Sequence, residues 1–225
     1  MSSNPEQHIL DSWHSNAAAW TTAIEQQTIE SRRLITNKAI VDVVSAQTPS
    51  TVLDIGCGEG WLCRELADKG MKVWGVDAIP DLIKAAQSKG KAEYAVFTYQ
   101  DIIAGSYQPA QTFDVIVFNF ALFGDELVSS LLLQLRSYLA PNARLIIQTL
   151  HPHIACGDSP YVSGWRNGSW AGFSTDFSDP APWFFRTLES WVSLLHETGY
   201  MLSDMKEPVH PNTGKPASII FVAKI

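Results

Sequence analysis

The sequence predicts an α/β fold built on a doubly wound, mostly parallel sheet. Between residues 51 and 150, short apolar segments alternate with amphipathic ones, and each short segment is apolar throughout. Continuous apolar strands are typical of parallel sheets with helices on both faces. The chain has 225 residues, of which 46% are hydrophobic and 17% charged. This length suits one domain, which we expect to span residues 1–225.

Residues 1–48 are expected to form an N-terminal helical cap. Trp13, Ala17, Trp20 and Ile24 recur at steps of four, three and four, and an apolar face continues as far as Val44. This spacing predicts helix over residues 9–46.

Residues 50–150 are expected to form the core, with five strands. The predicted strands are TVLDI (51–55), MKVWGVD (71–77), YAVFTY (94–99), FDVIVFNF (113–120) and ARLIIQTL (143–150). Helices are expected over 59–70, 80–90 and about 125–139, because Gly70 and Gly90 stand where glycine ends a helix and Pro80 stands where proline begins one.

The C-terminal third departs from this alternation. Residues 151–186 are rich in Gly, Pro, Asp and aromatic residues, and a loop beyond about 12–15 residues is usually functional or disordered. The many aromatic side chains of this segment argue against disorder, and we therefore expect a structured aromatic lid. Residues 187–225 are expected to form a helix and two strands near 200–206 and 217–224. The connection EPVHPNTGKP carries turn residues, which predicts an antiparallel hairpin and a total of seven strands.

Composition argues against several classes of protein. A formal net charge of −7 lacks the basic surface that nucleic acid requires, and no apolar run approaches the roughly 20 residues that span a bilayer. The polar N-terminus shows no secretory signal. Cys57, Cys63 and Cys156 form neither a CxxC motif nor a paired framework, which favours the cytoplasm. We expect no metal site, because His151, His153 and Cys156 lack an evident fourth ligand.

The turn after the first core strand indicates a cofactor site. Gly56, Gly58 and Gly60 lie where a doubly wound sheet binds its ligand, and glycines there let the backbone approach it closely. Asp77 ends the second strand about 20 residues later, where a carboxylate can accept both hydroxyls of a ribose. A ribose-containing cofactor is therefore expected.

The spacing of the turn distinguishes two cofactor classes. The dinucleotide pattern is G-x-G-x-x-G, whereas this turn reads Gly-Cys-Gly-Glu-Gly. Asp54 stands two residues before the first glycine, where a carboxylate would face a pyrophosphate unfavourably but would suit an ammonium group. Asp54 and Glu59 thus favour a cofactor with a positively charged end.

The segment VLDIGCGEG, residues 52–60, resembles the first motif of class I S-adenosylmethionine-dependent methyltransferases. FTYQDI (97–102) resembles the third-strand segment of that family and FDVIVFNFALF (113–123) its fourth-strand segment. The resemblance is strong over residues 50–150 and greatest to the small-molecule group that includes quinone-biosynthesis enzymes. Thr98 departs from it, because an acid is common there. The resemblance implies the Rossmann-like methyltransferase fold, with S-adenosylmethionine as cofactor and S-adenosylhomocysteine as product.

The resemblance also implies roles for individual residues. Asp54 and the turn residues Gly56, Cys57 and Gly58 would hold the methionine portion. Asp77 and its neighbour Ala78 would contact the ribose. Tyr99, Gln100 and Asp101 would contact the adenine. Asn119 and Phe120 would lie near the sulfur. Arg32 and Arg33 lie in the helices before the first motif, where one arginine, for which we take Arg32, could reach the cofactor carboxylate; the alternative for each is a solvated surface position.

The residues that act on the methyl acceptor are less defined. His151 follows the fifth core strand and is the candidate general base, although it could also simply cap the turn before Pro152. Trp165, Trp170 and Trp183 of the lid could bind a flat or cationic acceptor, or could simply pack.

The expected function is methyl transfer to an oxygen or nitrogen of a small molecule. Two alternatives stay open: a non-catalytic cofactor-binding or interaction protein on this fold, and an NAD-dependent oxidoreductase, which the glycine spacing disfavours. The sequence does not define the oligomeric state.

Overall fold

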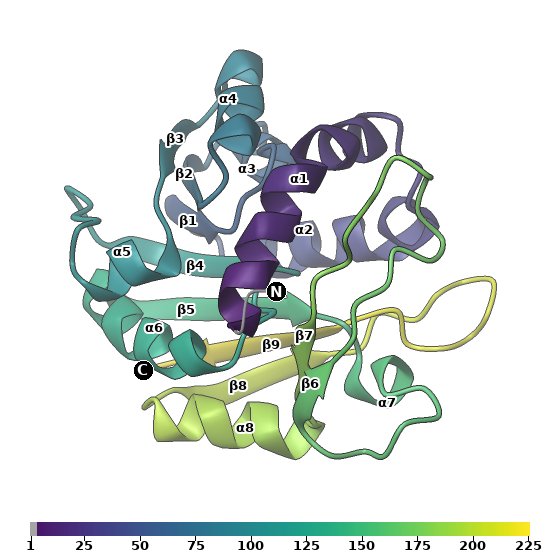
Figure 1. The fold of residues 1–225 in the computed structure, drawn as a ribbon. Helices are drawn as coiled ribbons and strands as arrows, with labels where there is room; N and C mark the ends of the chain where they lie inside the picture. Colours follow the sequence, from purple (N-terminus) through teal and green to yellow (C-terminus); the bar gives the residue numbers. More distant parts are fainter. Residues whose placement is uncertain (1–3) are drawn as a thin grey trace.

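A seven-stranded sheet forms the centre of the protein in the computed structural model, which describes residues 4–225 (Figure 1). The strand order is β3-β2-β1-β4-β5-β9-β8. The strands are β1 Thr51–Ile55, β2 Lys72–Asp77, β3 Glu93–Val96, β4 Phe113–Asn119, β5 Leu139–Thr149, β8 Met201–Lys206 and β9 Ile219–Lys224. β1 to β5 run parallel, and β9 runs antiparallel to both β5 and β8. The expected doubly wound sheet with a C-terminal hairpin is confirmed.

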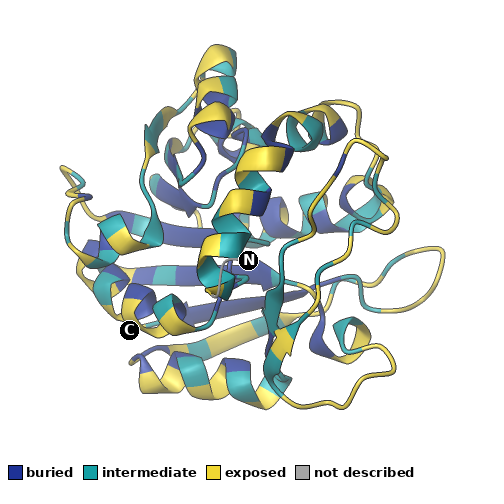
Figure 2. Cartoon of the chain, viewed as in Figure 1, coloured by how far each residue is buried: buried dark blue, intermediate teal, exposed yellow. Residues whose placement is uncertain are grey.

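Helices cover both faces of this sheet (Figure 1). They are α1 Pro5–Glu25, α2 Asn37–Ala46, α3 Trp61–Ala67, α4 Pro80–Lys89, α5 Tyr99–Ile103, α6 Glu126–Leu135, α7 Pro152–Ala155 and α8 Leu188–Glu197, with a π-helical turn Arg32–Thr36 and a 3₁₀ turn Arg136–Tyr138. Apolar side chains of α6 and α8 pack on one face, and those of α2, α3 and α4 on the other. Successive residues of β4 alternate between the two cores: Ile116 belongs to the first and Val117 to the second. The middle residues of the central strands β1, β4 and β5 are accordingly buried (Figure 2).

Two expected elements end earlier than the sequence predicted. The expected helix 9–46 is interrupted at residues 26–29, so α1 is separate from the π-helical turn and α2. The third strand stops at Val96, because Thr98 begins a helix instead. Thr98 accepts a hydrogen bond from the backbone of Asp101, whose carboxylate accepts one from the backbone of Thr98 in return. This capping box starts α5 at Tyr99.

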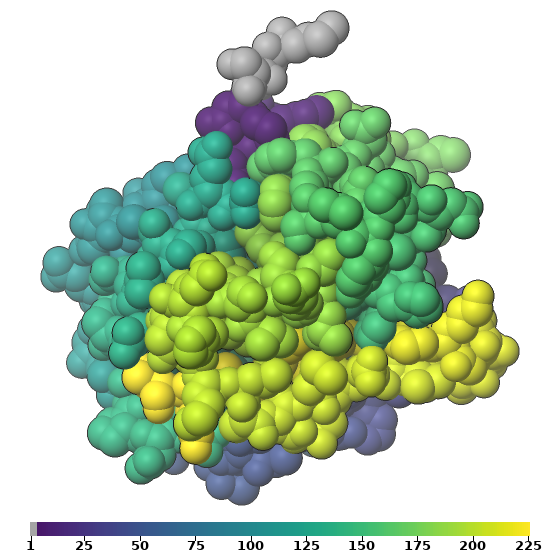
Figure 3. All heavy atoms as spheres, turned by 90° about the horizontal axis from the view of Figure 1, so that it is seen from below, coloured from purple at the N-terminus to yellow at the C-terminus, as the bar shows by residue number. Residues whose placement is uncertain are grey.

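The segment 151–186 is structured, as expected. It contains α7 and a two-stranded antiparallel sheet formed by β6, Gly164–Arg166, and β7, Trp183–Phe185. In the view from below, this segment packs in green beside α8 (Figure 3). Its far part contacts α1, where Ser12 Oγ donates to the Asp179 carbonyl at 2.6 Å and Asn16 exchanges hydrogen bonds with the Ser178 backbone.

Among the described residues, no helix combines the length and apolar character that crossing a membrane requires.

Candidate cofactor and acceptor site

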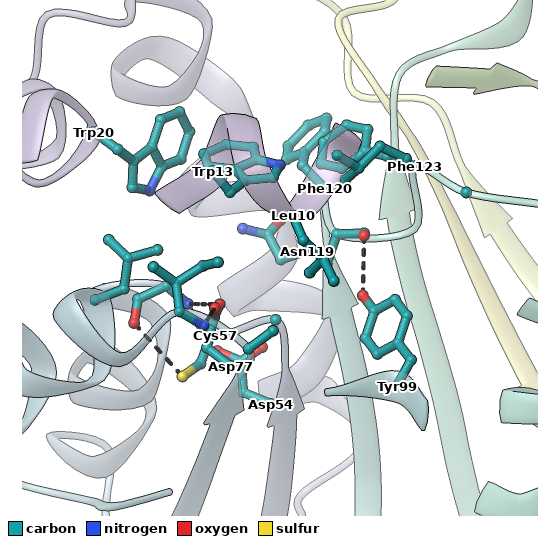
Figure 4. Close-up of a pocket in the computed structure, with 18 of the residues that line it drawn as sticks. Leu10, Trp13, Trp20, Asp54, Cys57, Asp77, Tyr99, Asn119, Phe120 and Phe123 are labelled. Atoms are coloured by element: carbon teal, nitrogen blue, oxygen red, sulfur yellow. Dashed lines mark hydrogen bonds between the residues drawn. The ribbon is translucent and has the colours of Figure 1, made fainter. Parts of the chain in front are cut away.

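A pocket opens at the carboxyl ends of β1, β2 and β4, beneath α1 (Figure 4). It comprises about 1010 Å³ of space free of protein atoms, including the part open to solvent. Strand ends at the point where the strand order reverses are the usual ligand site of such sheets. In this sheet the order reverses at β1, between β2 and β4.

The glycine turn forms the floor of the pocket. Gly56 has φ +75°, and a Cβ at this position would lie 2.5 Å from the Ala121 Cβ. The backbone N–H of Gly56 donates to the Val76 carbonyl at 2.8 Å, which ties the turn to β2. Only a residue without a side chain fits this backbone and this space.

Asp77, at the end of β2, organises the far side of the turn. Its Oδ2 accepts a hydrogen bond from the Gly58 N–H at 2.8 Å, and its Oδ1 accepts one from the Ile79 N–H at 2.9 Å. Burial raises the pKa of this carboxyl above its usual value, while the backbone donors oppose the shift. Each oxygen keeps a lone pair that can accept a hydroxyl from the pocket side.

Asp54 is buried at the end of β1, with 1% of its surface exposed. Cys63 Sγ approaches its Oδ2 at 3.4 Å, but its Oδ1 has no hydrogen-bond partner among the described residues. Burial raises the pKa of Asp54 to about 7. A buried carboxylate oxygen without a partner is costly, so this atom fits a ligand that brings a cation or a donor.

Arg32 brings the opposite charge to the same end of the pocket. Its Nε and Nη2 are buried and have no partner among residues 4–225. The guanidinium lies over two indole rings, 5.3 Å from the centroid of Trp20 and 4.8 Å from that of Trp61. Burial lowers the pKa of Arg32 to about 10, so the side chain stays charged at neutral pH. Two unsatisfied donors on a buried cation fit a carboxylate ligand.

Glu59 does not line the pocket, which corrects the expectation from sequence, although its charge helps to hold up the pKa of Arg32 against the effect of burial. Its Oε2 accepts hydrogen bonds from Arg64 Nη2 at 2.7 Å and from Lys89 Nζ at 2.6 Å. These two cations neutralise Glu59 below the turn. Among residues 52–60, the free carboxylate facing the pocket is therefore that of Asp54.

Several other residues expected at the cofactor line the pocket, and one does not. The lining includes Cys57, Ala78, Tyr99, Gln100, Asn119 and Phe120. Asp101 does not line it, because its carboxylate is used to cap α5. Phe120 has φ +54°, a strained conformation for a residue with a side chain, and such strain is concentrated at functional sites.

His151 lies outside the pocket, contrary to the proposed role as a base. Its ring is buried, and Nε2 lies 2.7 Å from Oε1 of Glu207. The turn after β5 directs it toward the connection between β8 and β9. No group of three metal-ligating side chains occurs here or elsewhere in the part of the chain that the structure describes.

None of the three lid tryptophans lines the pocket. Trp165 packs edge-on against Phe184, and Trp183 does the same against Phe185. Trp170 comes nearer, because its ring lies 5.9 Å from that of Trp13. The hairpin β6–β7 turns Trp165 and Trp183 toward their own segment, where Trp165 stays 36% exposed and Trp183 lines a second, smaller cavity.

The sequence did not assign the residues that α1 and the β4–α6 connection contribute. They are Glu6, Ile9, Leu10, Trp13, Trp20, Ala121, Phe123, Gly124 and Leu127, together with Trp61, Ile79 and Leu82. The helical spacing of Trp13 and Trp20 predicted a buried face, but the spacing alone does not tell whether that face meets the sheet or a ligand.

The pocket fits one type of ligand well. An unpaired guanidinium and an unpaired carboxylate at one end complement a free amino acid group, and Asp77 complements a ribose. Fold and site together define a class I S-adenosylmethionine-binding protein, because this cofactor carries both groups.

Comparison with known proteins agrees with this inference from the fold and the site. A family model described as "Methyltransferase domain" matches residues 30–203. An uncharacterised methyltransferase of Schizosaccharomyces pombe is 30% identical over 170 residues, which cover 72% of this chain and 64% of that protein. A ubiquinone biosynthesis O-methyltransferase of Xylella fastidiosa is 31% identical over 127 residues, covering 53% and 50%. The chain thus spans less than two thirds of the length of these relatives.

A solved structure shares the fold. The S-adenosylmethionine-dependent methyltransferase of Mesorhizobium loti superposes with a TM-score of 0.62 at 19% identity, covering 82% of this chain and 96% of that one. The chain belongs to the class I S-adenosylmethionine-dependent methyltransferase family, and the expectation from sequence is confirmed.

Proposed function

We propose that this protein transfers the methyl group of S-adenosylmethionine to a nitrogen or oxygen atom of a small molecule. The observation that carries the proposal is the pair of unpartnered buried charges, Arg32 and Asp54, at one end of the pocket. When bound, the cofactor supplies a methyl group that its sulfonium already activates.

The residues of the pocket have distinct roles in this proposal. Arg32 binds the cofactor carboxylate, Asp54 binds its ammonium group and Asp77 accepts the ribose hydroxyls. Gly56, Cys57 and Gly58 present backbone around the methionine portion. Ala78, Tyr99 and Gln100 enclose the adenine, and Asn119 and Phe120 lie near the reacting methyl group.

In this proposal, methyl transfer is promoted by the alignment of cofactor and acceptor and by the exclusion of water from the pocket. Leu10, Trp13 and Phe123 close the pocket from the side of α1 and the β4–α6 connection. Holding two reactants in line in a dry site can provide effective molarities of about 10⁵–10⁸ M. The lid contributes indirectly, since Trp170 packs on Trp13 and the Ser178–Asp179 backbone holds α1 in place.

We also propose that the protein works in the cytoplasm and that residues 1–225 form one domain. The three cysteines are all free, as a reducing compartment predicts. The Xylella relative, named an O-methyltransferase, supports an oxygen acceptor as one possibility within the proposed activity.

Methyl transfer from radiolabelled cofactor to the small-molecule fraction of a cell extract tests the proposal. We expect labelled product from the wild type and from Asp81→Ala, an exposed carboxylate on α4, but not from Asp77→Ala. Tight cofactor binding with no labelled product in any fraction would instead favour a non-catalytic binding protein.

A further inference from the structure

The part of the pocket not assigned to the cofactor is apolar except for Glu6 and Asn119. With the methionine end at Arg32 and Asp54 and the ribose at Asp77, the remaining lining comes from α1, from the end of β4 and from the β4–α6 connection. We call this part the acceptor chamber; it is lined by Leu10, Trp13, Asn119, Phe120, Phe123 and Leu127. Leu10, Trp13, Phe120 and Phe123 gather around Asn119 on the side opposite Asp54 and Asp77 (Figure 4).

The charges that line the whole pocket disfavour an anionic acceptor. Its titratable residues, among those described, are Glu6, Arg32, Asp54, Cys57, Asp77 and Tyr99. Three carboxylates thus face one guanidinium, and the proposed function commits that guanidinium to the cofactor carboxylate. A carboxylate or phosphate acceptor would therefore find no uncommitted cationic side chain among the described pocket residues to pair with, and burying an anion without such a partner is unfavourable.

None of the six residues that line the acceptor chamber carries a group that can remove a proton from a hydroxyl or a thiol. Glu6 also lines the pocket, and one of its two carboxylate oxygens is committed to the start of α6: Oε1 accepts from the Asp125 N–H at 2.7 Å and from the Glu126 N–H at 3.1 Å. The Tyr99 hydroxyl donates to the Ala121 carbonyl at 3.0 Å, and burial raises the pKa of Tyr99 and of Cys57, so both stay protonated.

Asn119 is the polar group that remains in the chamber. Its Oδ1 is buried and has no hydrogen-bond partner among residues 4–225. A buried amide oxygen without a partner indicates a ligand that completes its hydrogen bonds. Oδ1 can accept from an N–H of an acceptor held among the rings.

On the basis of the proposed function, we propose that the acceptor is a small apolar amine, which is methylated on nitrogen while in its neutral form. A neutral amine can donate N–H to Asn119 and still present its lone pair to the methyl group. The N–C bond forms as the C–S bond breaks, and the C–S electron pair stays on sulfur. The resulting ammonium loses its proton to water, so the enzyme needs no base.

The first test identifies the chemical class of the product even while the acceptor itself is unidentified. The small-molecule fraction of a cell extract is incubated with enzyme and methyl-labelled cofactor, and products are separated from unreacted cofactor. We expect the labelled product to bind a cation exchanger at acid pH and to resist alkali, as an N-methyl amine does. A neutral ether, or an ester that alkali cleaves, would overturn the amine assignment while supporting methyl transfer. No labelled product at all would count against the proposed function.

The second test uses matched acceptors that share one ring: benzylamine, aniline, phenol and benzoate. We expect kcat/KM for the amines to exceed that for phenol and benzoate at least about 100-fold, the lower end of what a missing general base costs. The midpoint of the pH profile should follow the pKa of each amine. Equal turnover of phenol, a midpoint fixed on the enzyme, or cofactor binding without turnover of either amine would overturn the inference.

Asn119→Leu separates acceptor binding from cofactor binding. We expect its kcat/KM for the amine to fall at least about tenfold, the worth of one good hydrogen bond in a dry site, with a retained thermal shift from S-adenosylhomocysteine. Unchanged turnover would contradict the role of Asn119. A lost thermal shift would mean that Asn119 serves the cofactor and would remove its support for the amine.

Discussion

The guanidinium of Arg32 lies 4.8 Å from the ring centroid of Trp61, with two of its nitrogens buried and unpartnered. The π-helical turn Arg32–Thr36 delivers this side chain to the glycine turn, and π-helical segments are rare and often functional. A cation held on aromatic faces without a carboxylate partner is prepared for an anionic ligand group.

Replacement of Arg32 by methionine should weaken cofactor binding without harming the free protein. A charged hydrogen-bonded contact is worth about 1.5–3 kcal/mol, so we expect the Kd for S-adenosylhomocysteine to rise roughly 10- to 100-fold by calorimetric titration. The melting temperature of the free protein should not fall, because the substitution removes an unpaired buried charge. Arg33→Met, at an exposed position of the same turn, is the control. Equal Kd values for both variants would refute the contact.

Asp54 should make the free protein less stable as the pH rises. Burial raises the pKa of its carboxyl from 3.8 to about 7, so the folded state holds this proton more tightly than the unfolded chain does. Between about pH 4 and 7 the wild type should therefore lose stability relative to Asp54→Asn, by at most about 1.4 kcal/mol per pH unit. Chemical denaturation at several pH values measures this difference. Parallel pH profiles for the two proteins would exclude a raised pKa.

Position 56 should tolerate no side chain, because the turn has no space for one. Gly56→Ala would place a Cβ 2.5 Å from the Ala121 Cβ, in addition to the strain of φ +75°. Gly105→Ala is a close control, because Gly105 has φ +74° and no atom within 4 Å of the added Cβ. Both variants share a backbone cost of about 1 kcal/mol or more. We expect Gly56→Ala to unfold at lower denaturant concentration than Gly105→Ala, and equal losses would show that the turn has room.

His151 should be dispensable for the chemistry. Its ring pairs with Glu207 and does not line the pocket. Loss of a general base usually costs about 10²–10⁴-fold in rate, whereas we expect His151→Gln to change kcat/KM by less than about threefold. Steady-state kinetics on a folded variant decides between these values, and a loss of 10²-fold or more would restore the catalytic role.

The sequence predicts the position of a residue well where that position depends only on the residue's own strand. Gly56, Asp54 and Asp77 stand at strand ends, and strand ends of a parallel sheet meet at one edge, so their positions in the chain fix their positions in space. Thr98 misled the strand assignment because its capping box overrode the apolar run around it.

The acceptor side of the site depends on contacts between distant segments. Glu6 reaches the start of α6, and Trp13 reaches Phe123, across more than 100 residues of sequence. No periodicity in α1 encodes these partners. His151 was misplaced for a related reason: a strand end gives the edge of the sheet, but the direction of the side chain depends on the following turn.

The central claim is that carboxylates at the ends of β1 and β2 bind a positively charged, ribose-bearing cofactor. Thermal unfolding with S-adenosylhomocysteine, and separately with NAD, tests it most directly. At 100 times its Kd, S-adenosylhomocysteine should raise the melting temperature by about 5–10 °C, and Asp77→Ala should abolish most of this rise. A rise with NAD alone, or an undiminished rise in Asp77→Ala, would contradict the account.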